Sequence, residues 1–213
     1  MGNPADIFFG IRKKSLSLSD IINNLYNNQF EMKTNHFFTI PVVLLGIILF
    51  SGCGFGNNNQ KKSAANEQTI FSEDSLFSLT IPKAWTQVTD YSLNDEAELQ
   101  AEKLLSSQYI VVLIENKNDL DYTFDEWTTT VSDTYFASFD DSSVLGRNDI
   151  LIDNQPAKQF EVNLTHDHIK MTMLATYVNG ENHYAQILAW TLASKYKSSL
   201  EELKAITNSI KGL

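Results

Sequence analysis

The chain has 213 residues, and its 43% hydrophobic and 20% charged content is typical of a globular protein, which excludes wholesale disorder and collagen-like repeats. Residues 53–213 carry twelve basic and twenty-three acidic side chains, a net charge of −11, and Arg147 is their only arginine. Because such a surface repels phosphate backbones, we expect no nucleic-acid partner. The single cysteine, Cys53, excludes an intramolecular disulfide and a cysteine-based zinc site.

Residues 1–31 form an asparagine-rich segment without a clear hydrophobic pattern. The segment 32–36 that follows is positively charged and lies directly before a long apolar run, as the start of a secretory signal does. We therefore expect translation to begin at Met32, with residues 1–31 a misassigned or disordered extension. The alternative is a genuine extended N-terminal region whose basic residues 12–14 lie on the cytoplasmic side.

The longest apolar run covers residues 37–50, which are fourteen residues without a charge. As a helix this run would span about 21 Å, which is short of the ~30 Å hydrocarbon core of a bilayer. Its length instead matches the apolar core of a signal peptide, and small and polar residues follow it directly. Residues 32–52 are therefore predicted to be a signal peptide.

The residues at the end of this signal peptide resemble a bacterial lipobox, in which a small residue precedes a cysteine that is acylated on sulfur. Ser51, Gly52 and Cys53 fit the pattern, whereas Phe50 stands where leucine is most common. The resemblance implies cleavage between Gly52 and Cys53 and a diacylglyceryl group on Cys53, which would hold the protein on the extracytoplasmic face of the cell membrane. The alternative is that Cys53 is an incidental thiol at the end of an uncleaved membrane anchor.

Two segments follow the cysteine. Residues 53–69 are predicted to be a flexible tether, because asparagine, glutamine and lysine dominate them and few apolar side chains are present to order them. Residues 70–213 are rich in aromatic and β-branched side chains, and about 140 residues is a common size for one domain. We therefore expect a single folded domain after the tether.

Hydrophobic periodicity predicts strands over 77–81, 109–114, 159–164, 169–178 and 183–192. The first and third alternate between apolar and polar residues, so one of their faces is expected to meet water. The other three carry apolar groups on both faces and need cover on both sides. Since turn-forming residues separate the later runs, four successive strands between about residues 148 and 192 are predicted to form an antiparallel meander.

Two helices are predicted from their N-terminal capping signals. Thr123 and Glu126 form a capping box, and apolar residues then recur at helical spacing. Ser198 and Glu201 offer a second box before a C-terminal helix, and residues 94–105 are a weaker third helix candidate. Helices before and after a meander with apolar central strands predict an α+β fold, a three-layer α/β/α sandwich around a mostly antiparallel sheet.

The segments 77–85, 109–119, 123–127, 157–162 and 200–210 together resemble bacterial lipoproteins with a PsbP-like domain. That class shares its fold with the extrinsic PsbP subunit of photosystem II and with a factor that releases nucleotide from the Ran GTPase. The resemblance implies a non-catalytic binding or docking module for an unknown protein or envelope component, because the fold hosts several partners.

His166 and His168 are the candidate metal ligands, because residues two apart on a strand project to the same side. A small-molecule or metal carrier that uses this pair is therefore the alternative function. The simpler interpretation is a polar hairpin tip, since the strand pattern ends there and the chain must turn.

Enzymatic chemistry has no signature in the sequence. The chain has no Gly-x-Ser-x-Gly nucleophile motif and no glycine-rich phosphate loop, and its only thiol is assigned to the lipid anchor. We therefore expect no catalytic residues, no cofactor and no enzymatic activity.

Overall fold

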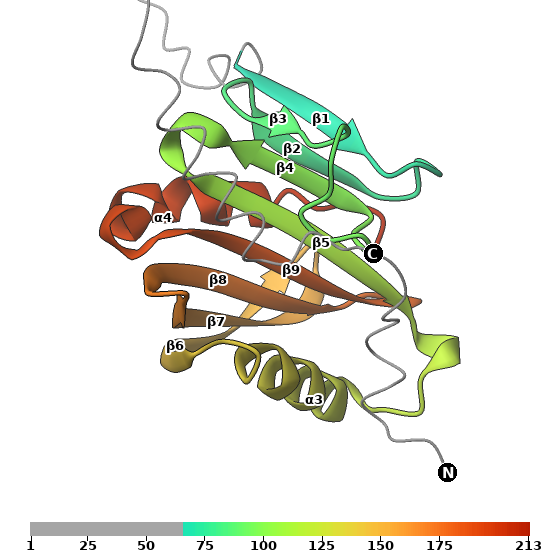
Figure 1. The fold of residues 1–213 in the computed structure, drawn as a ribbon. Coiled ribbons are helices and arrows are strands. Elements are labelled where there is room, and N and C mark those ends of the chain that lie inside the picture. Colours follow the sequence, from blue (N-terminus) through green and yellow to red (C-terminus); the bar gives the residue numbers. More distant parts are fainter. Residues whose placement is uncertain (1–65) are drawn as a thin grey trace, which may run out of the picture.

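The computed structural model describes residues 66–213, shown as a ribbon in Figure 1. The predictions for the signal peptide, Gly52 and Cys53 lie outside the described residues. The elements in chain order are β1 (Glu67–Phe71), β2 (Ser78–Pro82), β3 (Thr86–Gln87), β4 (Leu99–Lys103), η1 (Leu104–Ser106), β5 (Gln108–Asn116), η2 (Lys117–Asp119), α3 (Phe124–Phe136), β6 (Asp141–Ile152), β7 (Gln155–His166), β8 (Ile169–Asn179), β9 (His183–Leu192) and α4 (Ala193–Thr207).

The main sheet has seven strands in the order β3-β4-β5-β9-β8-β7-β6, and every neighbouring pair is antiparallel. β1 and β2 form a separate antiparallel hairpin. The helices α3 and α4 pack against opposite faces of the main sheet (Figure 1). The predicted α+β sandwich is therefore confirmed.

The predicted meander is confirmed as β6 to β9. Two of its hairpins close with two-residue turns, Asp153–Asn154 and Asp167–His168, in which all four residues have positive φ. Such turns match the right-handed twist of the strands they join. β6 begins at Asp141, earlier than predicted, because most of its side chains are exposed on both faces and no alternation marks them.

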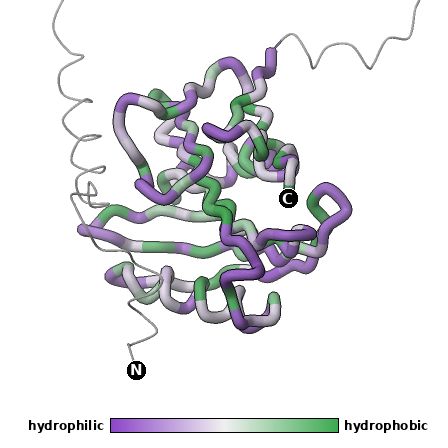
Figure 2. The backbone as a smooth tube through the Cα atoms, turned by 90° about the vertical axis from the view of Figure 1, so that its right-hand side faces the viewer, coloured by the Kyte–Doolittle hydropathy of each residue, from purple (hydrophilic) through white to green (hydrophobic). Residues whose placement is uncertain are grey.

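The apolar residues divide into two cores. The α4-side core joins Tyr196, Leu203 and Ile206 of α4 to strand residues such as Leu174 and Ile187. The α3-side core joins Trp127 and Phe136 of α3 to the other face of the same strands. Burial on both faces explains why the central strands carry apolar groups at successive positions. Figure 2 shows hydrophobic and hydrophilic residues interspersed along the strands.

The capping box of α3 is confirmed. The Thr123 Oγ1 atom accepts a hydrogen bond from the Glu126 backbone N–H at 3.4 Å, and the Thr123 N–H donates to Glu126 Oε2 at 2.9 Å. The hydrogen bonds from the Thr123 side chain and backbone lower the pKa of Glu126. The backbone N–H groups of Thr123 and Glu126 are thereby satisfied, which fixes where α3 leaves the preceding loop.

One helix prediction is wrong, and the predicted C-terminal helix is confirmed as α4 but starts earlier than expected. Residues 94–105 contain β4 instead of a helix, with Leu99 and Ala101 buried in the α4-side core, because pairing with β5 overrides local helix propensity. α4 begins at Ala193, so Ser198 lies inside the helix, where its Oγ donates to the Lys195 carbonyl at 2.8 Å. The helix starts early because it continues directly from β9 and buries Tyr196 in its first turn.

The fold also begins slightly before the predicted domain boundary. β1 starts at Glu67, inside the segment predicted to be a tether. Its first three residues are exposed and polar, and they are held by backbone pairing with β2. No apolar pattern marks such residues, so periodicity could not reveal them.

Candidate functional site

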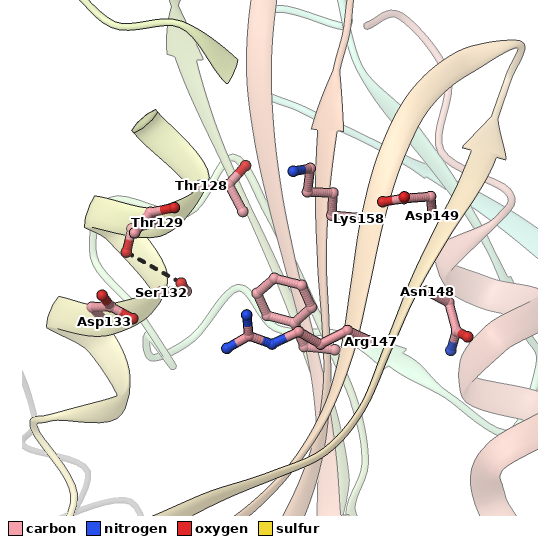
Figure 3. A pocket seen from close by; sticks show the side chains of 9 residues that line it. Thr128, Thr129, Ser132, Asp133, Arg147, Asn148, Asp149 and Lys158 are labelled. Atoms are coloured by element: carbon pink, nitrogen blue, oxygen red, sulfur yellow. Dashed lines mark hydrogen bonds between the residues drawn. The ribbon is translucent and has the colours of Figure 1, made fainter. Parts of the chain in front are cut away.

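A groove with a volume of about 290 Å³ separates α3 from the strands β6 and β7 (Figure 3). It is lined on the helix by Thr128, Thr129, Ser132 and Asp133, and on the strands by Arg147, Asn148, Asp149, Lys158 and Phe160. The groove lies beside the outer strand because α3 packs over the inner strands and does not cover β6. Nearly all of the lining side chains are polar or charged, so the groove can receive a polar group.

Arg147 is the most accessible cation of the groove. In Figure 3 its guanidinium extends from β6 toward α3, and its Cζ atom lies 5.0 Å from the centre of the Phe160 ring. A cation over an aromatic face is held by the quadrupole of the ring. Within residues 66–213, Arg147 has no carboxylate within 4.0 Å, so its positive charge can meet an incoming group.

Lys158 is committed to a partner. Its Nζ lies 2.7 Å from Asp125 Oδ1 and 5.9 Å from the centre of the Phe124 ring. This ion pair joins β7 to the first turn of α3. Because this charge is already paired, Lys158 is less free than Arg147 to meet an incoming group.

The helix wall supplies hydroxyl groups. Thr128 is buried, and its Oγ1 has no hydrogen-bond partner among the described residues. The hydroxyls of Ser132 and Thr129 donate to carbonyls within α3, at 3.2 Å and 2.8 Å, and keep their lone pairs as acceptors. These hydroxyls line the groove together with the carboxylates of Asp133 and Asp149.

The position of α3 depends on Trp127, which lies beneath the groove. The Trp127 ring stacks on Tyr184 at 4.8 Å between centroids and meets Tyr177 edge-on at 5.8 Å. Its Nε1 donates to Glu115 Oε1 at 3.2 Å. Burial raises the pKa of Glu115, and the hydrogen bond from Trp127 opposes that rise. These contacts hold the helix wall in place from below.

The predicted pair His166 and His168 does not project from one strand. His166 is the last residue of β7, and its ring lies 6.1 Å from Phe139, whereas His168 is exposed in the turn with a φ of 66°. The backbone reverses between them, so the rule for residues two apart on a strand does not apply. His166 and His168 therefore belong to a polar hairpin tip, as the simpler interpretation of the sequence expects.

Metal ligands are also sparse around this hairpin. Asp167 Oδ2 lies 3.7 Å from His166 Nε2. The backbone N–H of Asp167 donates to Asp140 Oδ2 at 2.8 Å, so Asp140 stabilises the turn. Within residues 66–213, no three histidine, cysteine or acidic side chains gather as a metal site would require. The described geometry therefore gives no support to the carrier alternative.

Sequence reasoning missed the groove. In the sequence, Arg147 stands out only as the lone arginine after residue 52, and nothing there marks the hydroxyl residues of α3. One signal could have indicated the groove. It is the lone arginine of an acidic domain, placed opposite an aromatic residue of the next strand. The pairing of Arg147 with Phe160 depends on the register of β6, which the sequence does not mark.

Within the described residues, no helix is long and apolar enough to cross a membrane. No protein-family model matches the sequence, and no curated protein matches it either. Cyanobacterial PsbP (CyanoP) from Synechocystis is a similar solved structure, with a TM-score of 0.55 and 13% identity over 76% of this chain and 97% of that chain. The domain has a PsbP-like fold.

A second structure with this PsbP-like fold is LpqN, which is described as involved in cell envelope biogenesis of Mycobacterium tuberculosis. Its TM-score is 0.52 at 11% identity, over 73% of this chain and 98% of that chain. At these identities the likeness shows the fold alone. The predicted resemblance to PsbP-like domains is confirmed at that level.

Proposed function

We propose that this chain is a lipid-anchored, extracytoplasmic docking module, which binds a protein or envelope component through its PsbP-like domain and catalyses no reaction. The observation that carries the docking role is the polar groove between α3 and the β6–β7 hairpin. Its exposed Arg147 and its hydroxyl wall offer both charge and hydrogen bonds to a partner. The polar lining supplies groups of both signs together with hydroxyls, which supports a binding role for the groove.

The proposed location rests on the sequence around Cys53. The chain's only thiol follows a small-residue pair and a fourteen-residue apolar run, as in a lipobox. Two acyl chains would make the attachment effectively permanent, because each buried CH2 contributes about 0.8 kcal/mol. The similarity in fold to LpqN, which takes part in cell envelope biogenesis, is consistent with a role in the envelope.

Substitution Cys53→Ala tests the anchor. We expect the variant to accumulate as an unprocessed precursor that takes up no labelled palmitate, whereas the parent chain is labelled and fractionates with membranes. Cys53→Ser is the matched control, since it restores polarity and size but not the acylated sulfur, and it should also fail. Equal labelling of the parent chain and both variants would contradict the lipid anchor.

Site-specific photo-crosslinking tests the docking surface. A crosslinking amino acid at Thr129, which is exposed on the groove rim, is expected to capture one defined partner in intact cells. The control position is Lys197, which is exposed on α4 on the other side of the sheet. Because it lies outside the proposed interface, the yield of crosslinked partner there should be lower by about tenfold or more. The mass of each adduct separates a foreign partner from a second copy of this chain. Equal adducts from the two positions would argue against the groove.

A further inference from the structure

β6 is an edge strand twelve residues long, and it pairs only with β7. The opposite edge, β3, is only two residues long and offers little to pair with. A β-bulge or charged side chains can blunt an edge, and β6 has a bulge at Val144–Gly146 that leaves residues 147–152 regular. Short length, lysine and proline are the other common means. β6 contains neither residue type, and it exposes Leu145 and Leu151 at 58% and 69% of their surface. Such an edge can pair with another strand.

The sequence of β6 is complementary to itself about Asn148. If two copies of β6 lie antiparallel with Asn148 opposite Asn148, Arg147 of each copy faces Asp149 of the other. In the same register, Leu145 of each copy faces Leu151 of the other. Opposite charges and apolar pairs directly across an antiparallel pair are stabilising. The strand therefore carries a matched set of partners for its own copy.

The charged residues of this set lie on one face of the sheet. Arg147 lies opposite Phe160 and Asp149 opposite Lys158 in the register with β7, and Phe160 belongs to the α3-side core. Opposed residues of an antiparallel pair point to the same face. Arg147 and Asp149 therefore both lie on the α3 side. In one copy the Arg147 guanidinium lies over Phe160, and it would turn from that ring to meet Asp149 of the other copy across the new strand pair.

Of the two apolar residues, Leu151 follows the same face by alternation. Leu151 lies two residues beyond Asp149, and Leu145 lies two residues before Arg147, at a β-bulge between Val144 and Gly146. Residues two apart in a strand project to the same side. Leu151 therefore lies on the α3 side beside the charged pairs. Leu145 is the extra residue of the bulge, where this alternation does not hold, and it enters the matched segment as an exposed apolar side chain.

The charges of this segment are unpaired within one copy. Neither Arg147 nor Asp149 forms an ion pair among residues 66–213, although Lys158 lies opposite Asp149, because Lys158 pairs with Asp125 instead. The remainder of residues 53–213 is strongly acidic, so two copies repel each other over most of their surface. A local match of opposite charges at β6 offsets that repulsion where the copies meet.

We propose that two copies of this chain associate by antiparallel pairing of β6 with β6 about a two-fold axis at Asn148. A two-fold interface is isologous, so the Arg147–Asp149 and Leu145–Leu151 contacts each occur twice. The pairing joins the two sheets into one and sets the two grooves side by side across the axis. This inference goes beyond the proposed docking function, because the strand pairing needs neither the anchor nor a foreign partner.

The association is expected to be weak and dependent on concentration. A strand pair alone buries less than the ~1,600 Å² of a standard stable interface. Confinement to a membrane surface would raise the local concentration of the chain and favour the pair. In solution, the pair is therefore expected to form only as the protein concentration rises.

Charge exchange tests the register. The full-length chain, purified in detergent, is examined by sedimentation velocity over a range of concentrations. Arg147→Asp alone and Asp149→Arg alone each place like charges opposite one another at both contacts, so each should weaken self-association by at least ~10-fold. The double variant Arg147→Asp with Asp149→Arg restores opposite charges and should associate like the parent chain.

The decisive sample is a mixture of the two single variants. Each fails to pair with itself, but together they place acidic side chains opposite basic ones at both contacts, so a mixed pair should form. Circular dichroism of each variant checks that the fold is retained. A parent chain that stays monomeric at all concentrations would overturn the proposal, as would single variants that associate like the parent. A monomeric parent whose β6 edge binds a peptide strand would assign that edge to a different partner.

Discussion

Replacing Trp127 with alanine is expected to lower the free energy of unfolding by about 3 to 5 kcal/mol. The side chain is fully buried, and its ring stacks on Tyr184 and packs against Tyr177. Its removal leaves a cavity between α3 and the sheet and removes the hydrogen bond to the half-buried Glu115. Urea denaturation followed by far-UV circular dichroism measures the loss.

Trp127→Phe is the matched control for that experiment. Phenylalanine keeps an aromatic ring in the stack but cannot donate to Glu115, so we expect a smaller loss of about 1 to 3 kcal/mol. The difference between the two variants separates packing from hydrogen bonding. If the free energy of unfolding of the alanine variant lies within about 1 kcal/mol of the parent value, the substitution acts like one at the surface. That result would show that Trp127 does not anchor α3.

The second large effect is expected on the other face of the sheet, at Trp85. This side chain is buried in the α4-side core, and its Nε1 donates to Glu202 Oε1 at 2.6 Å. Trp85→Ala should cost about 3 to 5 kcal/mol, because a cavity opens between the β2–β3 connection and α4. Thermal unfolding monitored by near-UV circular dichroism measures this loss.

The polar part of the Trp85 contact can be measured separately. Glu202 also accepts from Lys103 Nζ at 2.9 Å and 3.1 Å, so its carboxylate keeps a partner when the indole is removed. Trp85→Phe should therefore cost about 1 to 3 kcal/mol, the loss of one hydrogen bond to a charged acceptor with some packing. If the phenylalanine variant is as unstable as the alanine variant, the hydrogen bond outweighs the packing and our expectation is wrong.

The parts of the fold that the sequence predicted are those in which local pattern and tertiary structure agree. The central strands repeat apolar residues at strand spacing, and the Thr123 capping box is satisfied within four residues. β4 and the start of α4 were missed because distant partners decide them. β4 is held by β5, and the first turn of α4 is held by the burial of Tyr196.

The candidate groove could not be predicted for a related reason. Its two walls are fourteen or more residues apart in the sequence, and the register of β6 with β7 decides which side chains face α3. β6 carries polar and apolar residues without alternation, because both of its faces meet water. The register is therefore fixed by the two-residue turn at Asp153–Asn154. The sequence indicates that a turn lies there but not its exact length, on which the register depends.

The described chain begins at β1, which lies beside the β3 end of the sheet, where the Gln68 side chain donates to the Trp85 carbonyl and the Lys83 N–H to the Asn66 carbonyl. β6 is the opposite edge, six strand intervals away, which at about 4.8 Å per interval is roughly 29 Å. Two copies joined through β6 would therefore carry their starting points at the far tips of an elongated body. If both ends were attached to a bilayer, the long axis of this body would lie parallel to the membrane. The β6–β6 junction and the two grooves beside it would then lie midway between the attachment points.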